Sequence, residues 1–529
     1  MGSARFPEGT RLSLAVLLAA GLGLRLWGLD YGLPLTMARP DEEVVLLRLL
    51  TFDTGDPNPH WFMYPTLSLY LTFAWLKAML LGGHVSGVWA GPTDLAALAK
   101  ADPRALFLTA RLLCALVGVV TIAATYRLGR LLGGRGAGLV AALLLTVSFL
   151  HVRESHFFKP DAILALFITV ALIGCVHLQR RGTVGAAALA GAACGLALSV
   201  KYTLTLGVPL LLAVLLGRAG GGWRARAGLL AVAGAVAAAA AIAGSPYAVL
   251  AWSEFEPWLR FTSFWVKYGG EGWGTGFVYH LGHSFVAAQG LPLTAFSLGA
   301  LVWALRRRTL LPVAAFLLAS LVQLGVASAA YTRYLTPFLP GLYALAGVAL
   351  VALVERTSSG RARAGFAAAL LVLLAARPLH SAVRFDQTIA ARDTRLLARD
   401  WLLEHVPKGT PILLLGSDWP YVFGDPDLAG WVVRRNPTLD PELGIRWVVT
   451  HEHPLPFSRL PAEFAALRPQ LTLEQTFSPF TGTEAPRGAL FELRDAFYVP
   501  LAGFDQVTRG GPIIRIYRVT GGEATHGAA

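Results

Sequence analysis

The sequence predicts a polytopic α-helical membrane protein with about eleven transmembrane helices, followed by a small C-terminal α/β domain. Three observations support this fold class. Of the 529 residues, 55% are hydrophobic and 15% are charged, which is more apolar than the core of a soluble protein requires. The apolar residues form long runs bounded by charge, and a membrane span needs about 20 such residues. These runs shorten after residue 380, where Asp, Glu and Pro return. An ordinary cytosolic enzyme and a disordered chain are both excluded.

Eleven apolar runs are long enough to be predicted as membrane spans. The first could be mistaken for a cleaved signal peptide, but Arg25 interrupts it and no small-residue cleavage site follows. We therefore expect it to be an anchor. The predicted spans cover residues 12–29, 105–126, 137–151, 161–178, 184–200, 203–217, 228–250, 284–304, 309–328, 335–354 and 364–379.

The distribution of basic residues predicts which ends of the spans face the cytoplasm. The loops between the spans form two alternating sets. The first set holds 16 Lys or Arg and consists of residues 1–11, 127–136, 179–183, 218–227, 305–308 and 355–363. The alternate short loops hold only 6, and these loops cover 152–160, 201–202, 251–283 and 329–334. Because basic residues gather in short cytoplasmic loops, the second set is predicted to face outward. Topology therefore explains the net charge of +13, and we expect no nucleic-acid partner.

The first outer loop contains an apolar stretch that breaks the alternation. Residues 64–81 are apolar enough to span, but a twelfth crossing would put Asp41 on the opposite face from the later outward loops. We therefore expect juxtamembrane helices that lie in the interface or re-enter it. Everything from Asp30 to Arg104 is then predicted to lie outside.

The residues after 380 have the pattern of a separate α/β domain. A helix-like stretch from Asp393 to His405 leads into strand-like residues 412–416, and residues 446–450 and 512–519 also have the character of strands. An odd number of spans places this part outside the membrane. We therefore predict a transmembrane domain over residues 1–379 and an extracytoplasmic, periplasmic domain over residues 380–529.

The three cysteines, Cys114, Cys175 and Cys194, all lie in apolar segments. We expect them to be buried small hydrophobic residues. Neither a disulfide framework nor a cysteine metal site is predicted.

Charged side chains at the outer ends of the spans are the candidate site residues, because a charge inside the bilayer costs roughly 2.5 to 3.5 kcal/mol on insertion scales. The first group contains Arg39, Asp41, Glu42 and Glu43. A carboxylate held beside the membrane surface can serve as a general base. The helix dipole favours acidic residues in a first turn, and it explains Glu42 or Glu43 equally well.

The second group occupies the outer loop before the fourth predicted span. It consists of Arg153, Glu154, His156, Lys159 and Asp161. Asp161 follows Pro160 at a helix start, where capping is the alternative explanation. His151 and His156 are five residues apart, which does not place them on one helical face, so metal ligation by this pair is not favoured.

Two further outer positions carry cations that suit a phosphate. Lys201 is pinched between two apolar runs, and Lys is scarce in this chain. Arg333, followed by Tyr334, is the basic residue of another outward turn, and its planar fork matches a phosphate. Snorkelling to the interface and an aromatic belt are the structural alternatives. Together the four groups supply acids and phosphate-binding cations on one predicted membrane face.

These residues and their order resemble the bacterial C-fold glycosyltransferases, the superfamily of protein O-mannosyltransferases and the lipid A aminoarabinose transferase, similar to glycosyltransferase family 39. LRLWGLDYGLPLTMARPDE looks like the family's first helix and its Asp-Glu loop, and PHWFMYPTLSLYL looks like the His/Pro-rich segment that follows. TARLLCALVGVVTIAATYRLGRLLGG, the loop from Arg153 to Asp161, Lys201 and the pair Arg333 and Tyr334 come in the expected order. DTRLLARDWLLEHVPKGTPILL resembles the start of the outer domain in many bacterial members.

The resemblance implies roles for individual positions. Asp41 matches the acidic residue taken as the catalytic base, with Glu42 as its partner, and Asp161 matches the second acidic position. Lys201 and Arg333 match basic positions near the donor phosphate, where Tyr334, Lys159 and Arg153 are further candidates. The family usually has paired prolines in the His/Pro segment, whereas Tyr64, Pro65 and Thr66 supply one. His60 and His156 complete the set of candidate residues.

The implied function is transfer of a sugar from a polyprenyl-phosphate donor to a lipid, glycan or protein acceptor at the outer face of the bacterial inner membrane. In-line attack would invert the anomeric centre. No cofactor is required, no metal ligands are assigned, and a divalent metal remains compatible because related C-fold enzymes include metal users. The alternative is a transporter or flippase of isoprenoid-linked glycans, whose charges would be spread through the bilayer depth.

Overall fold

The computed structural model describes residues 8–218, 220, 222–268, 275–356, 360–416, 430–435, 437–439 and 444–520. The chain divides into two compact units. Unit 1 comprises Met1–Leu26 and Val44–Val383, and unit 2 comprises Trp27–Glu43 and Arg384–Ala529. A short segment from the N-terminal part of the chain therefore belongs with the C-terminal residues.

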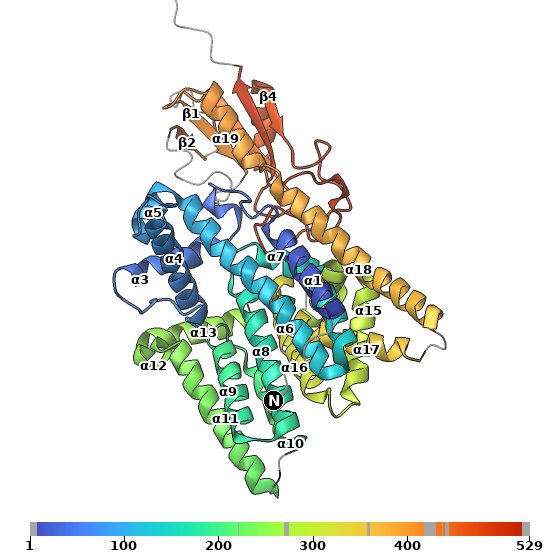
Figure 1. The fold of residues 1–529 in the computed structure, drawn as a ribbon. Coiled ribbons are helices and arrows are strands. Elements are labelled where there is room, and N and C mark those ends of the chain that lie inside the picture. Colours follow the sequence, from blue (N-terminus) through green and yellow to red (C-terminus); the bar gives the residue numbers. More distant parts are fainter. Residues whose placement is uncertain are drawn as a thin grey trace, which may run out of the picture. The chain divides into compact units, whose positions relative to one another are not determined.

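The described residues of unit 1 form helices joined by loops, with no strand among them (Figure 1). Every apolar run predicted as a span coincides with a helix. These helices are α1 Glu8–Leu26, α6 Pro103–Thr146, α8 Pro160–Arg181, α9 Val184–Leu198, α10 Gly207–Leu215, α11 Gly222–Gly244, α15 Phe285–Leu305, α16 Leu311–Val326, α17 Leu339–Val354 and α18 Gly360–Ala390, whose last residues belong to unit 2.

Six helical stretches in the described part of the chain are long and apolar enough to cross a membrane. They are Pro103–Thr146, Pro160–Arg181, Gly222–Gly244, Gly276–Leu305, Thr332–Val354 and Gly360–His405. Val184–Leu198, Leu204–Leu215 and Leu311–Val326 are apolar but shorter. These stretches support a polytopic membrane protein, and the count of eleven crossings stays a prediction.

The helix α6 contains two predicted spans because it is broken by a kink. Gly133 and Gly134 have non-helical backbone angles inside it, and Gly134 has a φ of 85°, which favours glycine. The glycine-rich stretch 133–138, which looks like a loop in the sequence, is thus a sharp bend within a continuous helical segment.

Further helices lie in the connections of unit 1. In the first long connection these are α2 Glu42–Leu47, which starts in unit 2, α3 Leu49–Asp53, α4 Leu67–Val85 and α5 Leu95–Ala101. The helix α4 covers most of the stretch predicted as interfacial or re-entrant, and it is not among the six candidate spans. The others are α7 Phe149–Ser155, η2 Leu204–Leu206, α12 Tyr247–Leu250, α13 Trp252–Tyr268, α14 Gly276–Tyr279, the π-helical η3 His280–Ser284 and η4 Thr332–Phe338.

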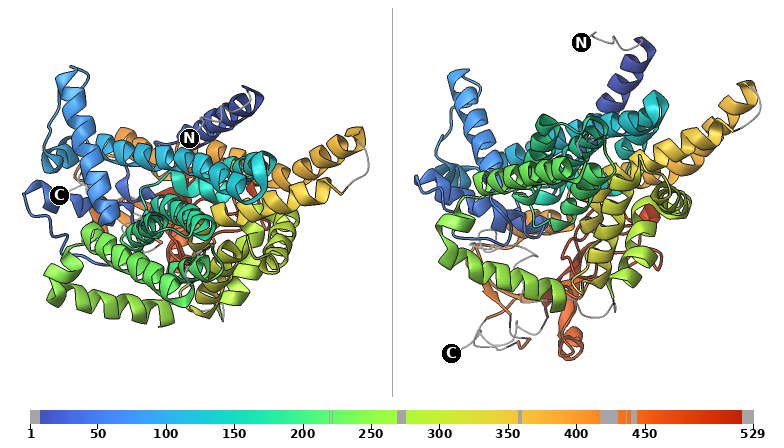
Figure 2. Two further views of the ribbon diagram at one scale, coloured as in Figure 1. Left: turned by 60° about the horizontal axis from the view of Figure 1, so that its bottom comes forward. Right: turned by 90° about the horizontal axis from the view of Figure 1, so that it is seen from below.

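Small residues allow the closest helix packing in unit 1. The helices α9 and α11 run side by side, and the further views of Figure 2 agree with Figure 1 on this. A Cβ atom at Gly191 or Gly195 would collide with the backbone carbonyl oxygens of Ala233 and Ala237. Glycines four residues apart therefore form the contact surface of α9, as is common where membrane helices approach closely.

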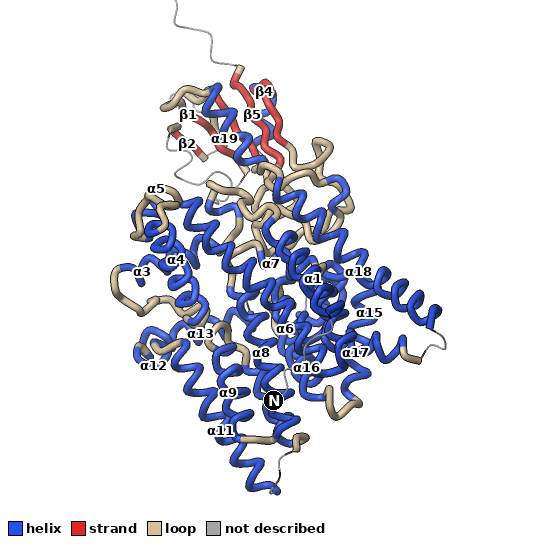
Figure 3. The backbone as a smooth tube through the Cα atoms, in the orientation of Figure 1, coloured by secondary structure: helices blue, strands red, loops and turns tan. Residues whose placement is uncertain are grey.

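Unit 2 contains a five-stranded sheet in the order β2-β1-β3-β5-β4 (Figure 3). The strands are β1 Pro411–Leu415, β2 Val432–Arg434, β3 Trp447–Glu452, β4 Leu471–Phe477 and β5 Ile513–Val519. Neighbours β2 and β3 run parallel to β1, whereas β5 runs antiparallel to β3 and β4. The three strands predicted from the sequence are β1, β3 and β5.

The helix α19 Thr394–His405 packs on one face of this sheet. Asp393 caps it by accepting a hydrogen bond from the backbone N–H of Arg395. Its apolar side contributes Ala398 and Leu402 to a buried cluster with Ile412, Val449 and Ile514. The remaining short elements of unit 2 are η1 Thr36–Ala38, α20 Phe464–Leu467, η7 Arg468–Gln470 and η8 Phe504–Gln506. The extracytoplasmic location of this unit stays a prediction.

Candidate functional site

Lys201 and Asp161 form an ion pair in unit 1, although forty residues separate them in the sequence. The Nζ atom of Lys201 lies 2.8 Å from Oδ1 of Asp161. The Asp161 side chain is 2% exposed and that of Lys201 is 22% exposed. Asp161 stands in the first turn of α8, whose N-cap is Lys159. The carboxylate of Asp161 thus holds a partly accessible ammonium group in place.

Tyrosine rings surround the ammonium group of Lys201. Its Nζ atom lies 4.6 Å from the ring centroid of Tyr334 and 5.6 Å from that of Tyr64. The guanidinium carbon of Arg333 lies 4.2 Å from the Tyr331 ring and 5.9 Å from the Tyr334 ring. Cation–π attraction orients both cations. The predicted cations Lys201 and Arg333 therefore share Tyr334 as a common neighbour.

The segment around Tyr64 reaches Lys201 because it docks on the ends of α9 and α11. The hydroxyl of Tyr202 donates to the Phe62 carbonyl oxygen at 3.0 Å. The backbone N–H of Leu67 donates to the Ser199 carbonyl oxygen, also at 3.0 Å. The hydroxyl of Thr66 donates to the Gly244 carbonyl oxygen at 3.2 Å. Tyr64 is a site candidate that sequence reasoning named only as part of a motif.

The charged residues before α8 are buried, and two of them form an ion pair. Arg153 forms an ion pair with Glu154 on α7, and both side chains are buried. The Nδ1 atom of His156 lies 2.9 Å from the Val152 carbonyl oxygen, one helical turn back. Lys159 is also buried. These residues thus form a polar layer directly before the helix that carries Asp161.

A second polar group next to Arg333 was not predicted from the sequence. The π-helical segment η3 places Nδ1 of His280 at 3.1 Å from the Ser284 hydroxyl, and the hydroxyls of Tyr279 and Thr332 are 3.1 Å apart. The Nε2 atom of His280 is buried and has no hydrogen-bond partner within the described residues. A π-helical turn is rare and is often functional, but no sequence pattern predicts it.

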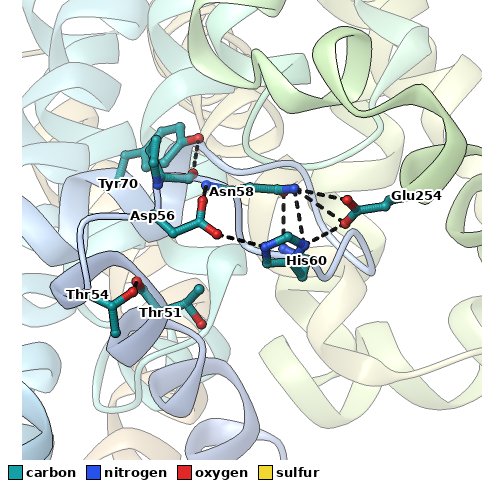
Figure 4. Close-up of polar contacts among 8 residues, drawn as sticks. Thr51, Thr54, Asp56, Asn58, His60, Tyr70 and Glu254 are labelled. Atoms are coloured by element: carbon teal, nitrogen blue, oxygen red, sulfur yellow. Dashed lines mark hydrogen bonds and ion pairs between the residues drawn. The ribbon is translucent and has the colours of Figure 1, made fainter.

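His60 lies in an exposed cluster that joins the first long connection to α13 (Figure 4). Its Nδ1 atom is 2.7 Å from Glu254, and its Nε2 atom is 2.9 Å from Asp56. The hydrogen bond to Asp56, followed by that to Glu254, raises the pKa of His60. The His60 side chain is 49% exposed, and its φ of 49° is unusual for a residue other than glycine. His60 therefore holds its loop against α13.

Asp41 and Glu42 lie in the segment of unit 2 that precedes α2. Asp41 is exposed, whereas Glu42 is buried. Asp41 has a φ of 68°, a left-handed conformation that only glycine adopts without cost and that clusters at functional sites. Glu43 is partly buried, and burial raises its pKa.

Metal ligation finds no support in the described residues, which contain no group of three His, Cys, Asp or Glu side chains arranged to hold an ion. The three cysteines are buried and free, as the sequence predicts.

Comparisons with known proteins agree on the fold. A family model described as dolichyl-phosphate-mannose-protein mannosyltransferase matches residues 105–265. No curated protein sequence matches the chain. ArnT from Cupriavidus metallidurans bound to undecaprenyl phosphate superimposes with a TM-score of 0.52 at 16% identity, over 98% of this chain and 99% of that one.

Another similar structure is the archaeal oligosaccharyltransferase AglB from Archaeoglobus fulgidus in complex with an inhibitory peptide and a dolichol-phosphate. Its TM-score is 0.52 at 14% identity, over 84% of this chain and 69% of that one. The same enzyme in complex with Zn and sulfate gives a TM-score of 0.52 at 14% identity, over 83% of this chain and 68% of that one. The chain therefore has the fold of the C-fold glycosyltransferase superfamily, which confirms the resemblance seen in its sequence.

Proposed function

We propose that this protein is a membrane glycosyltransferase that moves one sugar from a polyprenyl-phosphate donor to a lipid, glycan or protein acceptor at the outer face of the bacterial inner membrane. The observation that carries the proposal is the group formed by Lys201, Asp161 and Tyr334, which three separate segments contribute. Such a group suits the phosphate of a donor whose lipid tail lies in the bilayer. The similarity to the ArnT structure with undecaprenyl phosphate supports the same donor class.

The cations are proposed to bind the donor phosphate. An ammonium has three N–H donors, and Asp161 accepts one of them from Lys201. Arg333 offers a planar fork that suits two phosphate oxygens. Both would stabilise the charge that develops on the phosphate as the bond to the sugar breaks. Lys159 and Arg153 are further candidates for binding the donor phosphate, although Glu154 already compensates the charge of Arg153.

Asp41 is proposed as the general base, with Glu42 as its partner. The acceptor oxygen or nitrogen attacks the anomeric carbon, its proton passes to the Asp41 carboxylate, and the electron pair of the breaking C–O bond leaves with the phosphate. The products are the glycosylated acceptor and polyprenyl phosphate. Attack opposite the leaving group inverts the anomeric centre.

No step of this mechanism needs a nucleotide or a bound metal, because a phosphate leaves readily once its charge is stabilised. The partners are the bilayer, the lipid-linked donor and the acceptor. The C-terminal part of the chain is proposed to be extracytoplasmic, on the same side as the acceptor.

The proposal is tested in proteoliposomes that contain the purified protein, a labelled polyprenyl-phosphate sugar and a candidate acceptor fraction from the cell envelope. We expect label to move from the donor to the acceptor. Asp41→Asn should abolish this transfer, whereas Asp30→Asn, which removes another exposed carboxylate from the same segment, should leave it intact. Full transfer by folded Asp41→Asn would rule out Asp41 as the base.

The same vesicles distinguish the alternative function. A transporter or flippase of isoprenoid-linked glycans would change the leaflet in which the labelled donor resides without separating the sugar from its carrier. Mass spectrometry of glycolipids and glycoproteins from a deletion strain would then identify the acceptor and the sugar.

A further inference from the structure

The segment Trp27–Glu43, which carries Asp41, is part of unit 2 and is fastened to C-terminal residues at two points. The first point is Tyr31. Its hydroxyl donates to Oδ2 of Asp393 at 2.8 Å, and Arg395 binds the same carboxylate at 2.7 Å. All three side chains are buried. A Cβ atom at Gly510 would collide with the Tyr31 ring. The backbone of Gly510 therefore packs directly against this ring.

The second point is Arg39, only two residues before Asp41. An Nη1 hydrogen of Arg39 is donated to Oδ2 of Asp495 at 2.6 Å, and the side chains are 0% and 4% exposed. The guanidinium carbon also lies 4.6 Å from the ring centroid of Phe497. A buried ion pair is costly to break, because removing one partner leaves the other charge without compensation. The position of Arg39 is therefore strongly fixed.

The backbone transmits that position to Asp41 through a tight turn. The carbonyl oxygen of Arg39 accepts a hydrogen bond from the N–H of Glu42 at 3.4 Å, which closes a four-residue turn. Pro40 occupies its second position, and Asp41, with a φ of 68°, occupies its third. This is the pattern of a type II turn, whose third residue needs a positive φ and is usually Gly or Asn. Asp41 is therefore held in a conformation that its side chain disfavours.

We infer that Asp495 is a positioning residue for the reaction: through its ion pair with Arg39 it fixes the turn that aims the carboxylate of Asp41. The inference rests on the proposed role of Asp41 as the base. Asp495 is buried, and it acts through Arg39, which is the first residue of the turn. A displaced base loses rate steeply, since a shift of about 1 Å can cost roughly a hundredfold.

The test compares Asp495→Asn and Asp495→Glu in the full-length protein. We expect Asp495→Asn to lower kcat per folded molecule by about ten- to a hundredfold, with the KM for the polyprenyl-phosphate sugar unchanged. Asp495→Glu keeps the charge and should restore part of the rate. The matched control is Asp400→Asn, which breaks another Arg–Asp pair of unit 2, formed by Arg392 and Asp400, whose side chains are 49% and 44% exposed. This control should retain the original kcat.

A double variant shows whether Asp495 acts through Asp41. If it does, Asp41→Asn with Asp495→Asn should turn over at the same residual rate as Asp41→Asn alone. The inference would be overturned if the double variant were slower than Asp41→Asn by the same factor that Asp495→Asn causes alone. It would also be overturned if Asp495→Asn left kcat per folded molecule unchanged. Both results would leave the base assignment standing. Full turnover by Asp41→Asn would instead reject the base assignment itself.

Discussion

The pairing of Lys201 with Asp161 keeps a cation both paired and accessible beside an apolar environment, as the proposed phosphate site requires. An ammonium without a partner would be costly there, and a fully buried pair would be inaccessible. The observed pair avoids both problems, because Asp161 is buried while Lys201 keeps 22% of its side chain exposed. The tyrosine rings at 4.6 and 5.6 Å add attraction without neutralising the charge.

Replacing Lys201 by Met should therefore weaken donor binding and slow transfer. We expect kcat/KM for the polyprenyl-phosphate sugar to fall by about ten- to a hundredfold, the size of a lost charge-assisted hydrogen bond. Steady-state kinetics in detergent with a defined donor would measure this. The control is Lys77→Met, because Lys77 pairs with Asp53 at 2.7 Å but lies outside the Lys201 group. A kcat/KM for Lys201→Met equal to that of the control would contradict the proposed phosphate site.

At the level of single residues, sequence reasoning found the charges and Tyr334, but not which of these side chains contact one another. Lys201, Arg333 and Asp161 were identifiable because charge is expensive at the ends of apolar runs. Asp495 has no such signal, since a carboxylate in a mixed polar stretch resembles any surface residue. Its significance comes from a contact that spans most of the chain, and no local pattern encodes such a contact.

Among the elements, the helices of the apolar runs were predictable and their irregularities were not. Hydrophobic runs locate helices because the bilayer requires internally satisfied backbone hydrogen bonds. The kink at Gly133 and Gly134 and the π-helical segment η3 depend instead on how particular side chains pack. The close approach of α9 and α11 also depends on packing. It follows from the position of the glycines of α9 against the backbone of α11, which the sequence alone does not show.

Gly195→Leu should separate α9 from α11 and reduce the yield of folded protein. The new side chain would collide with the backbone carbonyl oxygen of Ala237. Backbone cannot move aside as a flexible side chain could, so the helices must separate. Fluorescence-detected size-exclusion chromatography would report the loss of the monodisperse peak. Gly185→Leu is the matched control on the same helix, because a Cβ atom at Gly185 meets nothing within 4 Å. Equal yields of the two variants would contradict this packing argument.

For the whole molecule, the predicted topology places the first long connection outside and the basic loops inside. The sequence argument rests on the unequal distribution of Lys and Arg, which is a property of the complete set of loops. The structure adds that the native cysteines are buried, so that they should contribute little background in a labelling experiment.

A cysteine at Thr54 should react with an impermeant thiol reagent applied to intact spheroplasts. Thr54 is exposed, and it lies in the connection predicted to be outside. A cysteine at Arg135, exposed in a loop predicted to be cytoplasmic, should react only after permeabilisation. Labelling of Thr54→Cys only in permeabilised cells would reverse the predicted orientation.

The ion pair of Arg39 has a consequence for the order in which the protein matures. Its partner, Asp495, is translated 456 residues later, and the partner of Tyr31 comes 362 residues later. The ribosome must therefore translate Asp495 before the turn around Asp41 can reach its final form. Chains that end before Asp495 would contain Lys201, Arg333 and Asp161 but would lack the ion pair that fixes this turn.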